Sequence, residues 1–526
     1  MHLVHAIQLH TLSMTASRYK LVILLLLILF LYGCASLPPR PNLEYESALP
    51  AANTGILPDL AQGFRASHGN EASGFHLLID AEESLTARLA LIDSAKNSLD
   101  LQYFIWKDDA VGILLLDRIM KAADRGVKVR VIVDDVWLAS STRTLTRLNS
   151  HPNLKIRIFN PNPARDTFIS RELHFIASYH SLNRRMHNKL MIVDNQAIIA
   201  GGRNIGNEYF GLSNKFNFLD IDVMAIGDVV KEASFAFDDY WNTDTVFPVS
   251  GWHQKMGKVD FANMKEDVEK SLWKHKKLLQ SYPLQPQNWD NWFSDIGERL
   301  HVGEAYFLQD DPVKIDGRDY RLIDMISYFS DPTEKELIIS SPYFIPVGDS
   351  LAVMERLESD GIQIKVFTNS LASTNHTLVN SHYKKYRRNI LLTGAELFEF
   401  NHQPSNEVIE LASAQSVTPR FISLHAKVMI SDRRKCFIGS LNFDPRALVI
   451  NSENGLLIDS PSLTGELTDF LNEIMEEKNS WYVVVNDNNS IEWRSEQSTR
   501  TTQPSRSFFQ TLSDFFGRFL PVEDQL

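Results

Sequence analysis

Two short motifs carry the side chains in this sequence that could act on a phosphate ester. Each motif reads His-x-Lys-x4-Asp, and its members are His187, Lys189, Asp194, His425, Lys427 and Asp432. An imidazole ionises near neutral pH, so it can serve as a nucleophile, an acid or a base, while an ammonium group stabilises charge on phosphate oxygens. One imidazole could attack phosphorus while the other protonates the leaving alkoxide and then deprotonates the incoming alcohol. The two motifs therefore predict phosphodiester cleavage or transfer through a phosphohistidine.

Each motif is followed, after six intervening residues, by the pattern G-[GS]-x-N. The residues of this pattern assigned to phosphate binding are Gly202, Asn204, Ser440 and Asn442. The asparagine amides could stabilise charge on the equatorial oxygens. Asp194 and Asp432 complete the catalytic motifs, but they lie at turns, and we expect them to brace the loop rather than touch substrate.

An attacking imidazole must be oriented at its other ring nitrogen, which requires a carboxylate near each histidine. The segment DID at 220–222 aligns with NSE at 451–453, which makes the last acids of the two segments equivalent. The resulting histidine-orienting assignments are Glu453 to His425, and Asp222 or Asp220 to His187. Capping of a helix or turn is the alternative role for these acids.

The sequence predicts neither a metal nor an organic cofactor. Its two cysteines, Cys34 and Cys436, cannot build a disulfide framework or a multi-cysteine metal site within one chain. The motifs already contain the charges that the reaction requires, and no ligand cluster stands near them.

The motifs occupy matching places in an internal duplication. The matches are His187 with His425 and Asn204 with Asn442 at an offset of 238, 103–105 with 343–345 at 240, and 126–135 with 361–370 at 235. The first half shows helical patterns at 85–98 and 112–125 and apolar strand patterns at 99–105 and 127–133. This alternation predicts an α/β fold in which helices cover both faces of a sheet.

The N-terminus is typical of an exported, lipidated protein. Arg18 and Lys20 precede an apolar run at 21–32, and the string that ends in Cys34 resembles a bacterial lipobox. Twelve residues span roughly 18 Å, short of the roughly 30 Å hydrocarbon core. We therefore expect a lipoprotein-type signal peptide over 1–34 with Cys34 lipidated, the alternative being an uncleaved anchor.

Composition divides the rest of the chain. The expected segments are a tether at 35–70, a first half at 71–250, a helical insert at 251–300, a second half at 301–485 and a tail at 486–526. The insert holds Trp252, Trp273, Trp289 and Trp292, whose indoles we expect to pack on the body, with a carbohydrate or lipid platform as the alternative. The tail is polar and expected to be mobile up to Ser507, after which apolar residues share one helical face that could dock on the domain or contact a bilayer.

Charge bears on the choice of substrate. The net charge of −12 gives no global field that would draw nucleic acid to the chain, so no nucleic-acid partner is expected. Basic clusters at 184–185, 384–388 and 433–435 could hold anionic headgroups or could simply be solvated.

The wording of the motifs resembles the phospholipase D superfamily. The matching strings are LNRRMHNK at 182–189, GGRNIGNEYF at 201–210, SPYFIP at 341–346 and GSLNFDPR at 439–446, which are similar to bacterial cardiolipin synthase C-like proteins. The resemblance implies two tandem α/β/α lobes related by a pseudo-twofold axis, with the active site at their seam and no metal. It also implies that His187 is the nucleophile and His425 the acid and base.

The expected activity follows from this resemblance. It is a phosphatidyltransferase that joins a phosphatidyl group to phosphatidylglycerol and forms cardiolipin, with phosphatidylethanolamine as a further substrate. A phospholipase D that releases phosphatidic acid is the alternative, and a nuclease is less favoured. We expect a membrane-anchored protein of the bacterial cell envelope that faces the periplasm, and the sequence leaves any accessory protein open.

Overall fold

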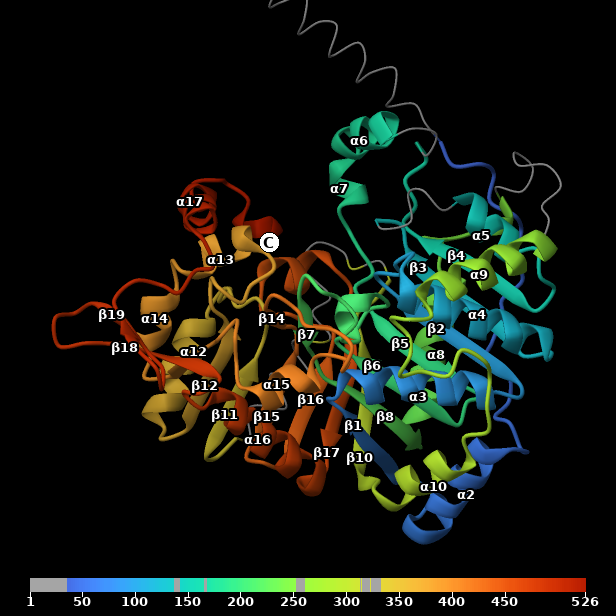
Figure 1. The fold of residues 1–526 in the computed structure, drawn as a ribbon, viewed down its shortest axis with the longest axis horizontal. Coiled ribbons are helices and arrows are strands. Elements are labelled where there is room, and N and C mark those ends of the chain that lie inside the picture. Colours follow the sequence, from blue (N-terminus) through green and yellow to red (C-terminus); the bar gives the residue numbers. More distant parts are fainter. Residues whose placement is uncertain are drawn as a thin grey trace, which may run out of the picture.

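The computed structural model describes residues 36–136, 142–164, 168–251, 261–312, 314, 322 and 333–526, and it forms two lobes (Figure 1). In each lobe helices cover a mixed β-sheet, as expected for an α/β fold. The strands of lobe one, in spatial order, are β9 (Val246–Pro248), β4 (Leu154–Phe159), β3 (Lys128–Asp134), β2 (Ser98–Tyr103), β5 (Lys189–Val193), β6 (Ala197–Gly201), β8 (Asp222–Gly227) and β1 (Ser73–Leu78).

Lobe two repeats this order of strands and extends it at one edge. Its strands are β10 (His301–Gln309), β17 (Asn454–Asp459), β16 (Lys435–Gly439), β15 (Val428–Ser431), β11 (Glu336–Ser340), β12 (Gln363–Asn369), β13 (Glu396–Phe400), β18 (Ser480–Val485), β19 (Ile491–Arg494) and β20 (Thr499–Arg500). The strand pairs β2–β3–β4 and β11–β12–β13 are parallel, because helices connect them.

The helices alternate with the strands, as predicted, but α3 begins and ends four residues before the predicted range 85–98. Those of lobe one are α3 (Ala81–Ser94), α4 (Ala110–Asp124), α5 (Thr142–Leu148), α6 (Phe168–Ala177), α7 (Tyr179–Leu182) and α8 (Val229–Asn242). Those of lobe two are α12 (Ser350–Ser359), α13 (Thr377–Tyr383), α14 (Arg387–Leu392), α15 (Asn406–Leu411), α16 (Pro461–Met475) and α17 (Phe508–Gly517). Asp80 and Asp109 cap α3 and α4 by accepting hydrogen bonds from backbone amides of their first turns.

The strand register corrects one of the predicted matches between the halves. Tyr103 lies opposite Lys189, whereas Ser340 lies opposite Val428, one residue beyond Lys427. Tyr103 is therefore equivalent to Ser341, at an offset of 238 rather than the 240 expected from the shared Tyr-Phe-Ile string. The offset of 235 for the next strand is confirmed. Tyr103 lies opposite Val133, and Ser340, one residue before the equivalent of Tyr103, lies opposite Phe367, one residue before Thr368, so Val133 is equivalent to Thr368.

The two lobes share one hydrophobic core. Strands β1 and β10 pair antiparallel at the seam, with Gly74 opposite Val302. A single cluster of buried residues then runs from Ile192 and Val223 in lobe one to Val428 and Ile458 in lobe two. Because apolar burial of this extent stabilises a fixed arrangement, the seam is a rigid place for a site.

Two segments expected to be loose are ordered. In the expected tether, Ala48 N donates to Asp238 Oδ2 at 2.7 Å, Ala52 N donates to Asp194 O at 2.9 Å, and α2 (Ile56–His68) follows. In the expected mobile tail, β19 and β20 form a hairpin on β18, and the buried Trp493 donates from Nε1 to Glu399 Oε2 at 2.9 Å. Both segments are held because the folded body offers partners that their polar composition did not reveal.

The insert between the lobes is helical, as expected. It contains α9 (Phe261–His275), which packs on α4, and α10 (Asp290–Glu298), which packs on α2. Trp289 is buried and donates from Nε1 to Asp93 Oδ2 at 2.9 Å, whereas Trp273 is exposed rather than packed on the body. Trp252 lies outside the described residues.

Candidate active site

The two motif histidines are positioned at the seam by a pair of equivalent backbone contacts. Strand β14 (Ile422–Leu424) pairs in parallel with β7 (Asn217–Leu219), and His425 N then donates to Leu219 O at 2.8 Å. In the other lobe Met186 forms a parallel bridge with Ser452, and His187 N donates to Ser452 O at 2.8 Å. Each histidine is therefore fixed by the backbone of the opposite lobe.

The orienting carboxylates also cross the seam. Glu453 Oε2 lies 2.8 Å from His187 Nδ1, and Asp220 Oδ2 lies 2.5 Å from His425 Nδ1. This reverses the predicted pairing, which assigned Glu453 to His425. The loop between motif and carboxylate is five residues longer in lobe one, so that Asp220, not Asp222, is the equivalent of Glu453. Matching backbone bonds establish this register, from Gly202 N to Ile221 O and from Ser440 N to Asn454 O.

Asp222 has a structural role, and the prediction that it orients a histidine is wrong. Its Oδ2 accepts from Arg88 Nη2 at 2.8 Å, and its Oδ1 accepts from the backbone nitrogen of Arg203 at 3.1 Å. The carboxylate points into the fold because successive side chains on a strand alternate between faces, and Arg88 lies buried below β8.

Lys189 and Lys427 bring two buried positive charges to the same place. Each Nζ donates to the carbonyl oxygen of its own motif histidine, two residues earlier. Burial lowers the pKa of Lys189 to about 7 and that of Lys427 to about 8, although the carboxylates of Glu453 and Asp220 favour the charged forms. The charge of Lys427 also lowers the pKa of Lys189, which places the two ammonium groups within one electrostatic site.

The histidines share this environment. Burial, reinforced by the charges of Lys189 and Lys427, holds the pKa of both His187 and His425 well below its usual range. Because each Nδ1 faces a carboxylate, the ring proton belongs on Nδ1, and Nε2 is the nitrogen free for chemistry. A bound phosphodiester would offset the lysine charges and so favour the protonated imidazole that an acid must supply.

Two residues predicted to bind phosphate instead position the carboxylates. A Cβ on Gly202 would lie 2.1 Å from Asp220 Oδ1, so only glycine leaves room for that carboxylate. At the equivalent place Ser440 donates from its hydroxyl to Glu453 Oε2. Both residues act through a histidine's partner, which a motif read as a phosphate cradle could not reveal.

The two asparagines differ from each other. Asn204 is engaged on both sides of its amide, since Oδ1 accepts from Ile105 N at 3.0 Å and Nδ2 donates to Tyr209 Oη at 3.1 Å. Asn442 is buried, and its Oδ1 has no hydrogen-bond partner among the described residues. Rotation of the Asn442 amide would therefore present its nitrogen without breaking a bond at Oδ1, so Asn442 remains the candidate for contact with phosphate.

The motif aspartates brace loops, as expected, and do not contact the histidines. Asp194 accepts from the backbone nitrogens of residues 96–98 at 2.7–2.9 Å, and Asp432 accepts from those of residues 334–336 at 2.8–3.0 Å. Each also begins a two-residue hairpin turn with positive φ at both positions, Asp194 with Asn195 and Asp432 with Arg433. Each aspartate therefore fixes one end of a strand, β5 or β15, and the motif lysine lies at or just before the other end of the same strand.

A buried ion pair behind Glu453 has no counterpart in any motif. Asp310 Oδ2 accepts from Glu453 N at 3.1 Å and from Lys314 Nζ at 2.8 Å, and Lys314 Nζ also donates to Asn451 O at 3.0 Å. Burial raises the pKa of Asp310 to about 6 and that of Glu453 to about 7. The only sign of this ion pair in the sequence is an acid four residues before a lysine. That spacing is common on surface helices, so it does not indicate a buried pair.

The basic clusters expected to hold headgroups are largely neutralised inside the chain. The pairs are Arg185 with Asp134, Lys384 with Asp514, Lys385 with Glu523, Arg387 with Glu399, Arg433 with Asp469 and Arg434 with Asp459. Among the described residues, no group of three or more histidine, cysteine, aspartate or glutamate side chains is arranged to hold a metal ion. In that same part of the chain no helix combines the length and the apolar character needed to cross a membrane.

Known proteins are similar to this chain in sequence and in fold. The family described as "Cardiolipin synthase, PLD-like domain" matches residues 89–241 and 325–475. Cardiolipin synthase C of Escherichia coli is 33% identical over 456 residues, covering 84% of this chain and 93% of its own. A cardiolipin synthase of Oceanobacillus iheyensis is 24% identical over 393 residues, covering 74% of this chain and 66% of its own.

Among solved structures, phosphatidylserine synthase of Haemophilus influenzae matches with a TM-score of 0.51 at 16% identity, covering 80% of this chain and 91% of its own. This likeness concerns the fold alone and agrees with the two-lobed arrangement. Paired histidine motifs at the seam, a family match in both lobes and a relative of similar length agree with one another. The chain belongs to the cardiolipin synthase family of phospholipase D-like enzymes.

Proposed function

We propose that this enzyme transfers a phosphatidyl group to phosphatidylglycerol through a phosphohistidine on His187, and so forms cardiolipin. The observation that carries the proposal is the reciprocal seam, in which two imidazoles are each oriented at Nδ1 by the opposite lobe and share two buried lysines. Such a site supplies a nucleophile, an acid and the charge that a phosphodiester needs.

The reaction proceeds in two balanced steps. His187 Nε2 attacks phosphorus, the bond to the first headgroup breaks, and His425 gives its Nε2 proton to the departing alkoxide. His425 then removes a proton from a hydroxyl of phosphatidylglycerol, whose oxygen attacks phosphorus and breaks the phosphorus–nitrogen bond. Phosphatidylglycerol as donor would release glycerol, and phosphatidylethanolamine would release ethanolamine. Lys189 and Lys427 stabilise charge on the equatorial oxygens in both steps.

Hydrolysis is the second candidate, because water can replace the acceptor alcohol. It would give phosphatidic acid by the same first step. Burial of both histidines favours transfer, since a site largely closed to solvent limits the access of water to the intermediate. A nuclease is less favoured, because the chain has a net charge of −12 and its basic clusters are paired internally.

Attachment to the membrane of the cell envelope, with the enzyme facing the periplasm, is part of the proposal. Its support is the sequence: an apolar run at 21–32 followed by Cys34, which lies outside the described residues. Intact-mass analysis of the protein extracted from membranes should show a lipidated Cys34 as the first residue. An unmodified Cys34 in that protein would refute lipidation.

Product analysis tests the activity. The purified full chain is incubated with phosphatidylglycerol in mixed detergent micelles, and lipids and free glycerol are measured by mass spectrometry. We expect cardiolipin and glycerol in equal amounts, and neither from H187A or H425A. H68A is the matched control, because His68 is exposed at the end of α2, outside the site. Phosphatidic acid without cardiolipin would assign hydrolysis instead, and nicking of supercoiled DNA would assign a nuclease.

A further inference from the structure

Helix α17 presents its apolar face to solvent and its polar face to the protein. Its outward apolar residues, continued just beyond the helix, are Phe508, Phe509, Leu512, Phe515, Phe516, Phe519 and Leu520, with Phe509 79% and Phe516 60% exposed. The buried positions are Gln510, Asp514 and Gly517. This is the reverse of the arrangement by which a helix normally docks on a soluble domain.

Polar contacts hold α17 in this orientation. Gln510 Nε2 donates to Leu371 O at 2.5 Å, and Asp514 accepts from Lys384 and from Gln503 Nε2, the latter at 2.7 Å. A Cβ on Gly517 would meet Ser381 Oγ at 2.7 Å, so the glycine allows close packing on α13. The orientation is thus specified by hydrogen bonds, and the apolar face is left outward.

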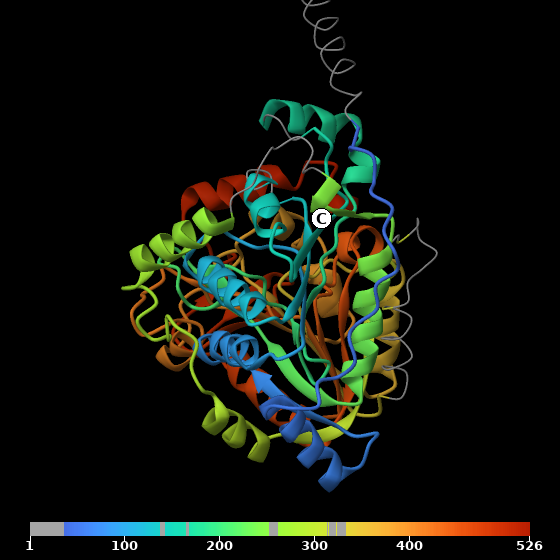
Figure 2. The same cartoon turned by 90° about the vertical axis from the view of Figure 1, so that its right-hand side faces the viewer.

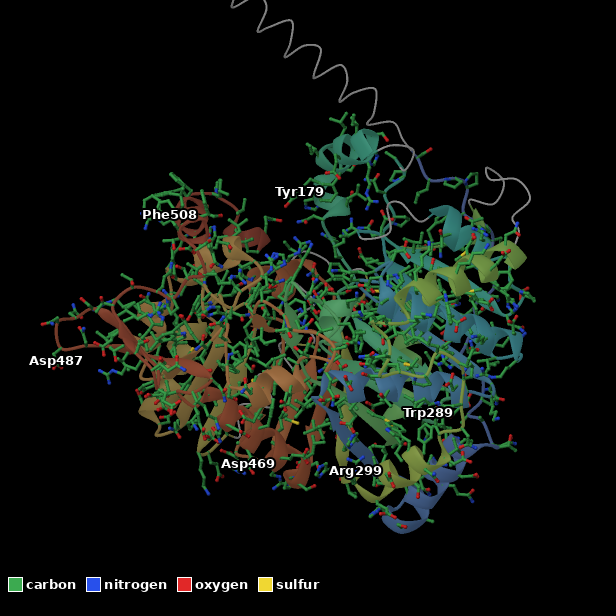
Figure 3. The ribbon with its side chains drawn as sticks, viewed as in Figure 1. Tyr179, Trp289, Arg299, Asp469, Asp487 and Phe508 are labelled. Carbon is green, nitrogen blue, oxygen red and sulfur yellow. The ribbon has the colours of Figure 1, made fainter. Side chains whose placement is uncertain are left out.

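A second exposed apolar patch lies on the other lobe. It is formed by Ile169 and Ile176 of α6 and Tyr179 of α7, each with 41–67% of its surface exposed. The end of the chain links the two patches, since Gln525 Oε1 accepts from Tyr179 Oη at 2.8 Å and from Asn183 Nδ2 at 2.6 Å. Two views at right angles place α17 and α6 toward the same end of the molecule (Figures 1 and 2), and in Figure 3 Phe508 and Tyr179 both lie toward that end, on different lobes.

This end of the molecule leads to the active site. Helix α7 is followed within five residues by His187, and α13, under α17, follows the loop that carries His376. The His376 ring packs edge-on against Tyr343, and its charge acts on the pKa of His425. Short stretches of chain therefore connect this end of the molecule to the catalytic histidines.

We propose that α17, with the α6–α7 patch, is a membrane-contact surface that seats the active-site mouth on a lipid bilayer. The proposed function supplies the reason why a lipid should arrive at this surface, and the proposal rests on it to that extent. The geometry of the surface does not depend on turnover. Three observations favour a bilayer as the occupant. First, seven outward apolar side chains form the patch on and just after α17. Second, Arg518 lies over the Phe515 and Phe519 rings at 4.3 and 4.6 Å, as a basic side chain at a headgroup boundary can. Third, the described chain, which the apolar run 21–32 precedes, begins at this same end (Figure 1).

Depth-dependent quenching tests the surface directly. F516W and F235W are prepared in the full chain and added to vesicles of phosphatidylglycerol and phosphatidylcholine whose acyl chains carry bromine. Phe235 is the matched control, because it is also a well exposed phenylalanine, 71% accessible, and lies on α8. Relative to the unsubstituted chain, the added indole at 516 should be quenched strongly and the one at 235 should not. Any N-terminal anchor is common to all three proteins and does not alter the difference.

Activity provides the second arm. F508S/F509S/F516S should lose roughly tenfold or more on vesicles yet stay within about twofold of the parent in detergent micelles, because the reacting groups are untouched. Absence of extra quenching at 516, or equal quenching at 235, would overturn the surface, and so would a stable dimer that buries α17. Quenching at 516 in a protein that makes no cardiolipin would keep the surface and remove the proposed function.

Discussion

At the scale of single residues, the two histidines are chemically equivalent except for what lies behind them. His187 is oriented by a glutamate that is itself held by Ser440 and by the Asp310–Lys314 pair. His425 is oriented by Asp220 with glycine beside it. The longer carboxylate in one lobe and the shorter one in the other therefore give the two imidazoles different settings in an otherwise symmetric seam.

Exchange of the carboxylates for amides should separate the two roles. E453Q disturbs the attacking imidazole and should reduce turnover by roughly 10²- to 10⁴-fold on every substrate. D220N disturbs the acid, so its loss on ordinary lipids should shrink when the leaving group is a nitrophenol that needs no protonation. Steady-state rates of both variants on phosphatidylglycerol and on a phosphatidyl nitrophenyl ester measure this. Rescue of E453Q rather than D220N would instead make His187 the acid and His425 the nucleophile, because Glu453 faces His187.

The lysines give the enzyme an alkaline limit. A lysine carries its charge below its pKa, and burial lowers these pKa values to about 7 for Lys189 and about 8 for Lys427. We therefore expect kcat/KM, which reports the free enzyme, to fall as the pH rises through this range. The limb for kcat should lie at higher pH, because a bound phosphate anion favours the charged lysines. A kcat/KM profile that stays flat through alkaline pH would contradict this.

At the scale of elements, each histidine-orienting carboxylate is held in place by the hairpin that follows a motif and by the strand that pairs with this hairpin. G202A should lower activity by roughly 10²-fold or more, since the new Cβ occupies the place of Asp220 Oδ1. G202S/D220E recreates the Ser440–Glu453 pair of lobe two and should recover part of that loss relative to G202S. Rates and melting temperatures of the three variants check this. A G202A enzyme as active as the parent would show that Asp220 is not so confined.

The helices and strands were largely predictable from the sequence, whereas the direction in which particular side chains point was not. Apolar runs at 99–105 and 127–133 predicted β2 and β3 to within two residues at each end, because such runs can be buried in few ways. The histidine-orienting carboxylates were misassigned because the loop between motif and carboxylate is longer in lobe one. The segment DID contains two acids, and the sequence does not reveal which of them is equivalent to Glu453. The phenylalanines of α17 were placed on one face, but a helical period cannot say whether that face points inward.

At the scale of the whole molecule, the active site exists only where the lobes meet. Each lobe supplies one histidine, one lysine and the carboxylate for the other lobe's histidine. The sequence could predict the duplication and the motifs, but the exchange of carboxylates across the seam depends on tertiary contacts such as the pairing of Met186 with Ser452. Reciprocity of this kind makes the duplication necessary for chemistry rather than merely for size.

Since one chain completes its own site, mixing cannot repair it. Equal amounts of H187A and H425A, co-incubated or co-expressed, should show no more activity than either protein alone. An exchange of lobes between two chains would instead regenerate one intact site per pair of chains and a substantial fraction of parental activity. Assay of the mixture beside a parent diluted to the same amount distinguishes these outcomes.

The central claim is that His187 carries the phosphatidyl group, and the most direct measurement is the adduct itself. The H425A enzyme is treated with a phosphatidyl nitrophenyl ester, quenched under basic conditions, digested and sequenced by mass spectrometry. The account predicts nitrophenol release and a phosphatidyl group on His187, absent from H187A/H425A. Nitrophenol release from H425A with the group on any other residue, or the same release from the double variant, would contradict it.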